Sequence, residues 1–178
     1  MTGWRPGDRR PDRASMLRVN QAGEYGATRI YAGQLAVLRR NSPASKLIAR
    51  MDGQERLHLE RFNALMAERR VRPTVLQPVW DVAGFALGAA TALMSEEAAM
   101  ACTEAVETEI DRHYGRQLEE LGEDDPELAA DIEAFRAEEV EHRDSAREAG
   151  AERAFGYPVL TAAVRAGCRV AIGLSKRI

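Results

Sequence analysis

The stretch Gln54-Glu55-Arg56-Leu57-His58 contains a Glu-x-x-His pair, and Glu138-Glu139-Val140-Glu141-His142 contains a second one. Residues three apart on a helix lie on the same face, one turn from each other. Both pairs also fall on stripes of apolar residues that recur at three- and four-residue spacing, which predicts amphipathic helices. Each of these helices therefore turns one carboxylate and one imidazole toward the core.

Two further glutamates, Glu24 and Glu107, interrupt the apolar stripes of two other helices. Glu55 follows Glu24 at almost the same spacing as Glu139 follows Glu107. Each spacing straddles a turn signal, Asn41-Ser42-Pro43 in one half and Gly122 to Pro126 in the other. The two carboxylates of each hairpin are therefore expected at similar heights, within about one helical turn of 5.4 Å.

Helical periodicity extends over nearly the whole chain, and no strand or hairpin pattern competes with it. The predicted helices cover residues 13–40, 43–70, 96–121 and 126–150, with an apolar crossover at 79–95 and a last helix from about 158 to 178. We expect an all-α, ferritin-like four-helix bundle of two antiparallel hairpins, with the apolar crossover helix and a C-terminal amphipathic helix. Residues 16–178 form one domain, and residues 1–15, rich in Arg and Pro, form a flexible N-terminal tail.

Four carboxylates in one core indicate a metal centre. A single buried carboxylate costs on the order of several kcal/mol, and two divalent cations would neutralise four of them. The predicted ligands are Glu24, Glu55, His58, Glu107, Glu139 and His142. Carboxylates with imidazole and without thiolate suit iron or manganese, and iron fits oxygen chemistry best.

The alternative is a set of solvated glutamates on charged helices, since Glu is mostly exposed in proteins. The matched spacing of the two halves argues against it for the whole set. Glu104 is a local rival of Glu107. We interpret Glu104, Glu138 and Glu141 as solvated residues or as groups that support the ligands from behind.

Composition narrows the function further. The net charge of −3 offers no basic excess for nucleic acid. Cys102 and Cys168 lack the spacing of a zinc or disulfide framework and are interpreted as buried thiols in a reducing compartment.

Two segments indicate contact with a membrane. Residues 82–95 carry no charge but are shorter than the roughly 20 residues of a membrane-spanning helix. The last helix has Arg165, Arg169 and Lys176 on one side and apolar residues on another, a pattern suited to anionic headgroups. Core packing of both helices is the alternative. Gly23 and Gly26 flank Glu24 and indicate close approach of either a substrate or a neighbouring backbone.

The chain resembles the demethoxyubiquinone hydroxylases of ubiquinone biosynthesis, the Coq7 type, over about residues 18–178. The resemblance is carried by Asn20-Gln21-Ala22-Gly23-Glu24-Tyr25-Gly26-Ala27, by Glu55-x-x-His58, by residues 80–87 and 101–107, by Glu138-Glu139-Val140-Glu141-His142 and by residues 166–172.

This resemblance implies a monooxygenase that hydroxylates the ring of a polyprenyl methoxy-methyl-benzoquinol (demethoxyubiquinol) with O2 and a di-iron centre. It implies two Fe ions on the six ligands above, with Glu55, Glu139 and Glu107 as candidates to bridge them. His113 and Tyr114 match a His-Tyr pair linked in the family to electron delivery, with NADH as candidate reductant, and are the predicted catalytic residues.

The expected location is the periphery of a bacterial inner membrane, on its cytoplasmic face. Candidate protein partners are another protein of ubiquinone biosynthesis or a second copy of the chain. Two other functions remain as alternatives, a ferritin-like ferroxidase or peroxidase and a non-enzymatic membrane-bound helical interaction module.

Overall fold

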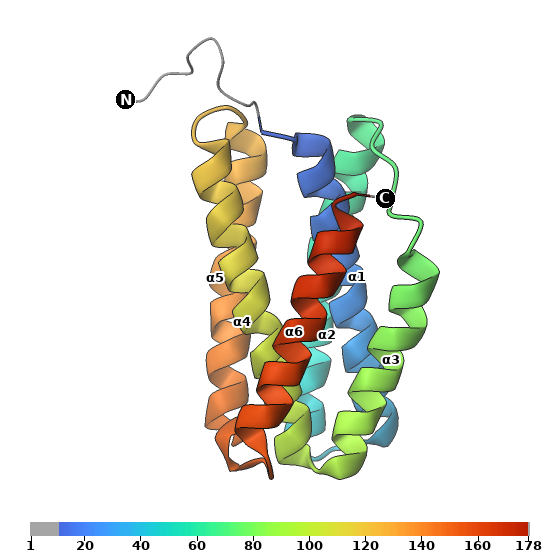
Figure 1. Ribbon diagram of the computed structural model, residues 1–178. Coiled ribbons are helices and arrows are strands. Elements are labelled where there is room, and N and C mark those ends of the chain that lie inside the picture. The colour runs from blue at the N-terminus through green and yellow to red at the C-terminus, as the bar shows by residue number, and fades with distance from the viewer. Residues whose placement is uncertain (1–10, 178) are drawn as a thin grey trace.

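The computed structural model describes residues 11–177, and in this range the chain is helical without any strand (Figure 1). The prediction of an all-α fold is confirmed. The elements are α1 (Arg13–Val37), α2 (Pro43–Glu68), α3 (Gln77–Met94), α4 (Glu96–Leu121), α5 (Pro126–Glu148), the 3-10 turn η1 (Ala151–Arg153) and α6 (Tyr157–Ser175).

The starts of α2 and α5 follow the predicted turn signals. The side chains of Ser42 and Asp125 each accept a hydrogen bond from the backbone amide three residues on, which satisfies one of the free amides of the first turn. Ser95 does the same for α4. The end of α1 differs from the prediction, because the helix stops at Val37 rather than near residue 40. Leu38 leaves the helix in an extended conformation and buries its side chain in the core.

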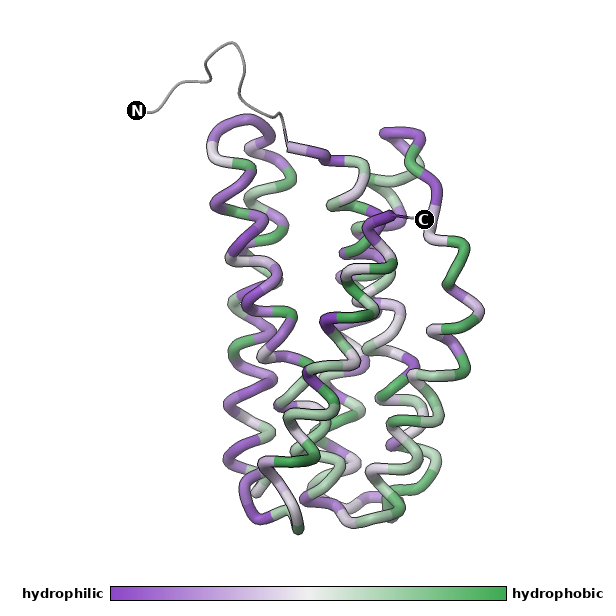
Figure 2. The backbone as a smooth tube through the Cα atoms, viewed as in Figure 1, coloured by the Kyte–Doolittle hydropathy of each residue, from purple (hydrophilic) through white to green (hydrophobic). Residues whose placement is uncertain are grey.

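The bundle consists of two antiparallel hairpins, α1–α2 and α4–α5, which stand side by side in Figure 1. The crossover α3 packs along α1, and α6 lies over α4 and the edge of α1. Figure 2 shows α3 and α6 with long hydrophobic stretches, whereas the α4–α5 hairpin carries many hydrophilic residues.

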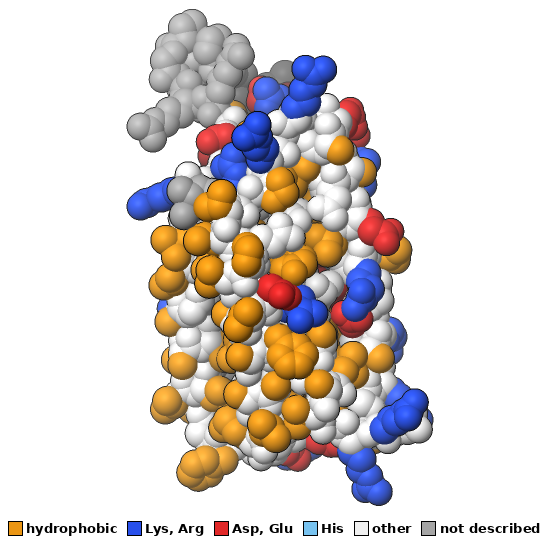
Figure 3. Space-filling view, turned by 90° about the vertical axis from the view of Figure 1, so that its right-hand side faces the viewer, with side chains coloured by type: hydrophobic (Ala, Val, Ile, Leu, Met, Phe, Trp, Pro, Cys, Tyr) orange, Lys and Arg blue, Asp and Glu red, His pale blue; other side chains and the backbone are white. Residues whose placement is uncertain are grey.

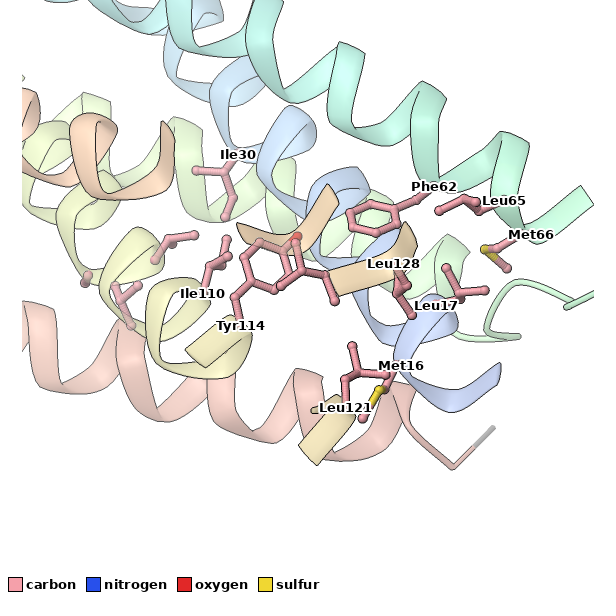
Figure 4. Close-up of a cluster of buried hydrophobic side chains, with 14 of the residues drawn as sticks. Met16, Leu17, Ile30, Phe62, Leu65, Met66, Ile110, Tyr114, Leu121 and Leu128 are labelled. Atoms are coloured by element: carbon pink, nitrogen blue, oxygen red, sulfur yellow. The ribbon is translucent and has the colours of Figure 1, made fainter. Parts of the chain in front are cut away.

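Two apolar clusters fill the two ends of the bundle. One contains Leu17, Phe62, Leu65 and Leu128, several of which appear in Figure 4. The other cluster lies toward the opposite end of the bundle. It contains Tyr31 and a set of smaller side chains: Ile48, Met51, Ala99, Met100 and Ala146. The helix midpoints that carry the six predicted ligands lie between these clusters, so apolar layers close the centre of the bundle on both sides.

Glycines let α3 approach α1 backbone to backbone. A Cβ atom built at Gly88 would overlap the carbonyl of Ile30, and one at Gly33 would overlap the carbonyl of Phe85. Since backbone atoms cannot move aside as a flexible side chain can, these positions need glycine. The crossover is therefore fixed against the bundle along one face, and its other face is exposed.

None of the helices between residues 11 and 177 is long and apolar enough to cross a membrane. Of the tail predicted for residues 1–15, residues 1–10 lie outside the described part of the chain. Residues 13–15 belong to α1, where the hydroxyl of Ser15 donates a 2.9 Å hydrogen bond to the carbonyl of Lys176.

Candidate metal centre

The six predicted ligands meet in the middle of the bundle. Each of the four long helices contributes to the cluster, and none of the six residues is more than 2% exposed. Glu24 comes from α1, Glu55 and His58 from α2, Glu107 from α4, and Glu139 and His142 from α5.

These side chains form two overlapping groups. The first contains Glu24, Glu55, His58 and Glu139, and the second contains Glu55, Glu107, Glu139 and His142. Within each group the candidate ligand atoms all lie within 4.8 Å of one another. Glu55 and Glu139 belong to both groups, whereas Glu24 and Glu107 each belong to one.

Eight buried atoms of these residues have no hydrogen-bond partner among the described residues. They are Glu24 Oε2, both carboxylate oxygens of Glu55, His58 Nδ1, Glu107 Oε2, both oxygens of Glu139 and His142 Nδ1. Buried polar atoms are normally paired, and each unpaired one costs about 1–3 kcal/mol, more if it is charged. A pair of cations would satisfy all eight at once, so the donor set fits two divalent metal ions.

Both histidines turn the same ring nitrogen into the cluster. His58 Nδ1 lies 3.3 Å from Glu139 Oε1, and His142 Nδ1 lies 3.1 Å from Glu55 Oε1. Their Nε2 atoms point outward, where His58 Nε2 lies 3.2 Å from Glu138 Oε2 and His142 Nε2 lies 3.1 Å from Gln54 Oε1. A metal-binding histidine usually donates its second N–H in this way.

Without cations, the electrostatics of the cluster are unfavourable. Burial raises the pKa of Glu55, Glu107 and Glu139, and repulsion from the neighbouring carboxylates raises it further in Glu55 and Glu107. Burial lowers the pKa of His58, but Glu139 and Glu24 outweigh it and bring the pKa to about 10. Without metal, positive charge is therefore drawn into the site as protons.

Two tyrosines hold Glu24 and Glu107, the glutamates that belong to one group each. The hydroxyl of Tyr114 donates to Glu24 Oε1, and the hydroxyl of Tyr31 donates to Glu107 Oε1. Both rings are buried. Burial, followed by the charge of the adjacent glutamate, raises the pKa of each phenol, so both remain protonated donors. The sequence places Tyr31 on an apolar stripe and gives no signal for this role.

His113 lies apart from the two ligand groups. It is buried beside Asn20 and Gln117, with Nε2 at 3.2 Å from Asn20 Oδ1 and at 2.9 Å from Gln117 Nε2. Its ring centroid lies 6.0 Å from that of Tyr114, which contacts Glu24. Burial lowers the pKa of His113 to about 3, so the ring is neutral.

Glu104 is not a solvated residue. Its side chain is buried and accepts 2.7 Å hydrogen bonds from Arg147 and Tyr157, so it joins α4 to α5 and to the start of α6. Glu138 is partly exposed and contacts His58 as described above, while Glu141 is exposed.

An apolar cavity of about 440 Å³ lies between α1, α3, α4 and α6. Its lining includes Gly23 and Val106, the neighbours of Glu24 and Glu107 in the chain, together with Trp80 and Cys168. A Cβ atom at Gly23 or Gly26 would meet no atom within 4 Å. These two glycines therefore open the cavity wall, and close helix packing at their own positions does not explain them.

Two antiparallel hairpins that supply one glutamate from each of two helices and a Glu-x-x-His pair from each of the others define the ferritin-like class of carboxylate metalloproteins. The sequence matches the family described as "Ubiquinone biosynthesis protein COQ7" over residues 12–175, and the chain belongs to this family. The predicted resemblance and the prediction of a hydroxylase-type enzyme are thereby confirmed.

Several similar proteins carry names that agree with this family. The "3-demethoxyubiquinol 3-hydroxylase" of Rhodospirillum rubrum is 53% identical over 97% of this chain and 82% of its own length. The human "NADPH-dependent 3-demethoxyubiquinone 3-hydroxylase, mitochondrial" is 54% identical over 92% of this chain and 76% of its own. The "5-demethoxyubiquinone hydroxylase, mitochondrial" of Saccharomyces cerevisiae is 44% identical over 92% and 77%.

Proposed function

We propose that this protein is a di-iron monooxygenase that hydroxylates the ring of a demethoxyubiquinol in ubiquinone biosynthesis. The observation that carries the proposal is the set of eight unpaired buried atoms in two groups that share Glu55 and Glu139. The names of the similar proteins support the substrate class. They give no support to the ferroxidase or interaction-module alternatives.

The residues have separate roles in this proposal. Two irons would be held by Glu24, Glu55, His58 and Glu139 at one position and by Glu55, Glu107, Glu139 and His142 at the other, so both would draw on Glu55 and Glu139. Two bound irons would supply the redox chemistry that activates O2. Tyr114 and Tyr31 orient the two outer glutamates, and the apolar layers on either side of the cluster exclude bulk water.

The apolar cavity is the proposed site of the substrate. Its walls provide a nearly uncharged surface for a prenylated ring, and Gly23 and Gly26 let a flat group approach α1 beside Glu24. Overall, one oxygen atom of O2 enters a ring C–H bond, and two electrons and two protons reduce the other atom to water.

A reduced nicotinamide nucleotide is the proposed electron donor, and assays with NADH and NADPH decide between the two forms. NADH is the candidate from the sequence, while the name of the human relative contains NADPH. The role of His113 and Tyr114 in electron delivery stays a proposal. The contact of Tyr114 with Glu24 supports a path from this pair to the metal ligands.

The proposed location is a membrane surface, reached through the apolar residues that α3 and α6 expose. We define the α3–α6 apolar surface by these residues and by Phe155 before α6: Val79, Val82, Phe85, Leu93, Met94, Val159, Val170 and Leu174. Figure 3 shows hydrophobic side chains spread over the face on which α3 lies.

Residues 16–178 act as one domain in this proposal, since the ligand cluster and the apolar cavity together draw on all six helices. Another protein of ubiquinone biosynthesis or a second copy of the chain remains a candidate partner.

Genetic complementation tests the function. In a bacterial strain that lacks its own hydroxylase, the demethoxy quinone accumulates and is measured by mass spectrometry. We expect this chain to restore ubiquinone and the His142→Ala variant to fail, although both accumulate as folded protein. Failure of the unmodified chain, with two irons bound per protein, would contradict the substrate assignment, and loss of both metals from anaerobic preparations would contradict the metal centre.

A further inference from the structure

A hydrogen-bonded bridge on the outside of the metal centre links the two predicted ligand histidines. Glu138 Oε2 lies 3.2 Å from His58 Nε2 and accepts a 3.0 Å hydrogen bond from Gln54 Nε2. The same amide presents Oε1 to His142 Nε2 at 3.1 Å. One glutamate and one glutamine thus connect the outer nitrogens of both rings. The sequence offered support of the ligands as one alternative for Glu138 and gave no signal for Gln54.

The chemistry of Glu138 fixes the direction of every hydrogen bond in this bridge. A carboxylate only accepts, so His58 must carry its proton on Nε2, and Gln54 must point its NH2 group toward Glu138. The oxygen of the Gln54 amide then faces His142, which must also carry its proton on Nε2. In a neutral ring, the form that binds a metal, Nδ1 then carries the free lone pair, and both Nδ1 atoms are buried and unpaired in the cluster.

The two histidines nevertheless have different partners. His58 donates to a carboxylate, and its ring also stacks on Phe135 at a centroid distance of 4.0 Å. His142 donates to a neutral amide oxygen, and no ring contact is recorded for it within residues 11–177. A carboxylate partner makes imidazole a more basic and better fixed metal ligand than an amide partner does.

The other contacts of the two metal positions are balanced. Each position has one outer glutamate that accepts a hydrogen bond from a buried tyrosine, and both share Glu55 and Glu139. The partner of the histidine is therefore the main difference between them. We propose that Gln54 and Glu138 are positioning residues that set both histidines as Nδ1 ligands and make the position at His58 the tighter of two unequal metal sites.

Single-histidine backgrounds test this inference, which rests on the proposed metal centre. His142→Ala leaves the His58 position and His58→Ala leaves the His142 position. Anaerobic titration with Co(II), followed by its absorption and by competition with a chelator, gives the affinity of each. We expect binding to be about tenfold tighter in the His142→Ala background, the lower end of the effect known for such outer partners.

Two further variants assign the difference to the bridge. Glu138→Gln keeps a hydrogen-bond acceptor beside His58 but removes the charge, and it should abolish the tenfold difference. Gln54→Ala should weaken Co(II) binding more in the His58→Ala background, where His142 loses its partner. Glu141→Gln is the matched control, because it removes the same charge from the same helix at an exposed position that forms no hydrogen bond or ion pair with either histidine.

The outcomes separate this inference from the function it rests on. Equal affinities in the two backgrounds, or an equal effect of Glu141→Gln and Glu138→Gln, would overturn the inequality while leaving the metal centre intact. If the unmodified protein bound no Co(II) or Fe(II), the proposed metal centre itself would fail. Circular dichroism of each metal-free variant verifies that its helices are formed.

Discussion

Glu55 is a single residue that lowers the stability of the folded protein when no metal is bound. Both of its carboxylate oxygens are buried without a partner, and burial together with the charges of Glu139 and Glu24 raises its pKa well above the ordinary value. A carboxyl group whose pKa is raised on folding destabilises the folded state at any pH above its unfolded pKa. Only a bound cation reverses this sign.

Glu55→Gln should therefore change stability in opposite directions with and without metal. In the metal-free protein at pH 7, we expect the free energy of unfolding to rise by about 1–3 kcal/mol, because a repelled buried carboxylate is replaced by a neutral amide. In the presence of Fe(II) or Mn(II), the variant should be less stable than the parent, since it loses a bridging ligand. Urea unfolding with chelator and with metal measures both, and Glu60→Gln on the exposed side of α2 should change neither. A loss of stability in the metal-free Gln variant would contradict the account.

Gly23 offers a second test at this scale, because a side chain there would enter the cavity. Gly23→Leu places its side chain in open space, so the fold should tolerate it and gain up to about 1 kcal/mol from helix propensity. The KM for the quinol should rise about tenfold or more, as expected when bulk is added to an apolar pocket. Gly53→Leu, at an exposed position of α2, is the control with the same propensity gain and an unchanged KM. Unchanged KM in Gly23→Leu would place the substrate elsewhere.

Periodicity predicts a role that is visible on a single helix. It cannot predict a role that depends on side chains from other helices. The Glu-x-x-His pairs were recognisable because both members lie on one helix face, and the structure brings all six predicted residues together. Tyr31 and Gln54 were not recognisable, since a tyrosine on an apolar stripe and a glutamine beside one are ordinary. Their roles depend on which side chains of other helices face them. The same holds for the burial of Glu104, which needs Arg147 and Tyr157 from α5 and α6.

The role of the crossover helix α3 could not be decided from the sequence. Its apolar stretch could indicate either packing or membrane contact, and the structure uses it for packing on one face. Gly88→Ala tests the packing face, because the new Cβ would meet the backbone of Ile30. The helix gains about 1 kcal/mol from propensity, but overpacking costs typically about 1–3 kcal/mol, so we expect a net loss of stability.

Thermal unfolding of Gly88→Ala beside Gly173→Ala measures this effect. Gly173 is exposed on α6, and a Cβ there would meet nothing within 4 Å. Its alanine variant should unfold at the parental temperature or above it. A Gly88→Ala protein as stable as this control would show that α3 can shift on α1, and the rigid crossover would be wrong.

The start of α5 provides an element whose stability depends on pH. Burial raises the pKa of Asp125, but the hydrogen bonds from Arg69 and from the amide of Leu128 outweigh it, so the pKa lies below the ordinary value of 3.8. A depressed carboxyl pKa contributes stability above the unfolded pKa, and this stability is lost as the pH falls through the folded pKa.

Asp125→Asn should therefore lower stability at pH 7 by about 1 kcal/mol and have a smaller effect at pH 3, below the ordinary carboxyl pKa of 3.8. Asparagine is also a good N-cap, so the hydrogen bond with Leu128 is kept and only the charge is lost. The difference in unfolding free energy between parent and variant, measured with urea at both pH values, gives the result. A difference that stays constant with pH would assign the effect to capping and not to the ion pair with Arg69.

At the scale of the whole molecule, the order of helices and both hairpins could be predicted, because caps, prolines and apolar periodicity are local signals. The arrangement of α6 could not. Its basic residues suited anionic headgroups in the sequence, but Arg165 and Arg169 donate 2.8 Å and 3.0 Å hydrogen bonds to the buried carboxylate of Glu109 on α4. Two of the three predicted headgroup contacts are thus engaged within the protein.

This pairing determines which kind of membrane binding is expected. With Arg165 and Arg169 paired to Glu109, the α3–α6 apolar surface should supply most of the binding energy. Flotation with neutral phosphatidylcholine vesicles should recover the protein nearly as well as flotation with anionic vesicles, and the binding should depend little on salt. Strong binding to anionic vesicles alone would mean that the arginines leave Glu109 and that the basic edge dominates.

Substitutions on that surface decide whether it is the part that binds. The side chains of Val82 and Val170 are 69% and 61% exposed, and burying such a side chain in a membrane is worth about 1.5–3 kcal/mol. The double variant Val82→Glu with Val170→Glu should therefore lose vesicle binding at least about tenfold. Leu57→Glu is the matched control, because Leu57 is 63% exposed on α2 and lies outside the α3–α6 apolar surface. Equal losses in both variants would mean that any added charge weakens binding, and the membrane would then have to meet the molecule through a different face.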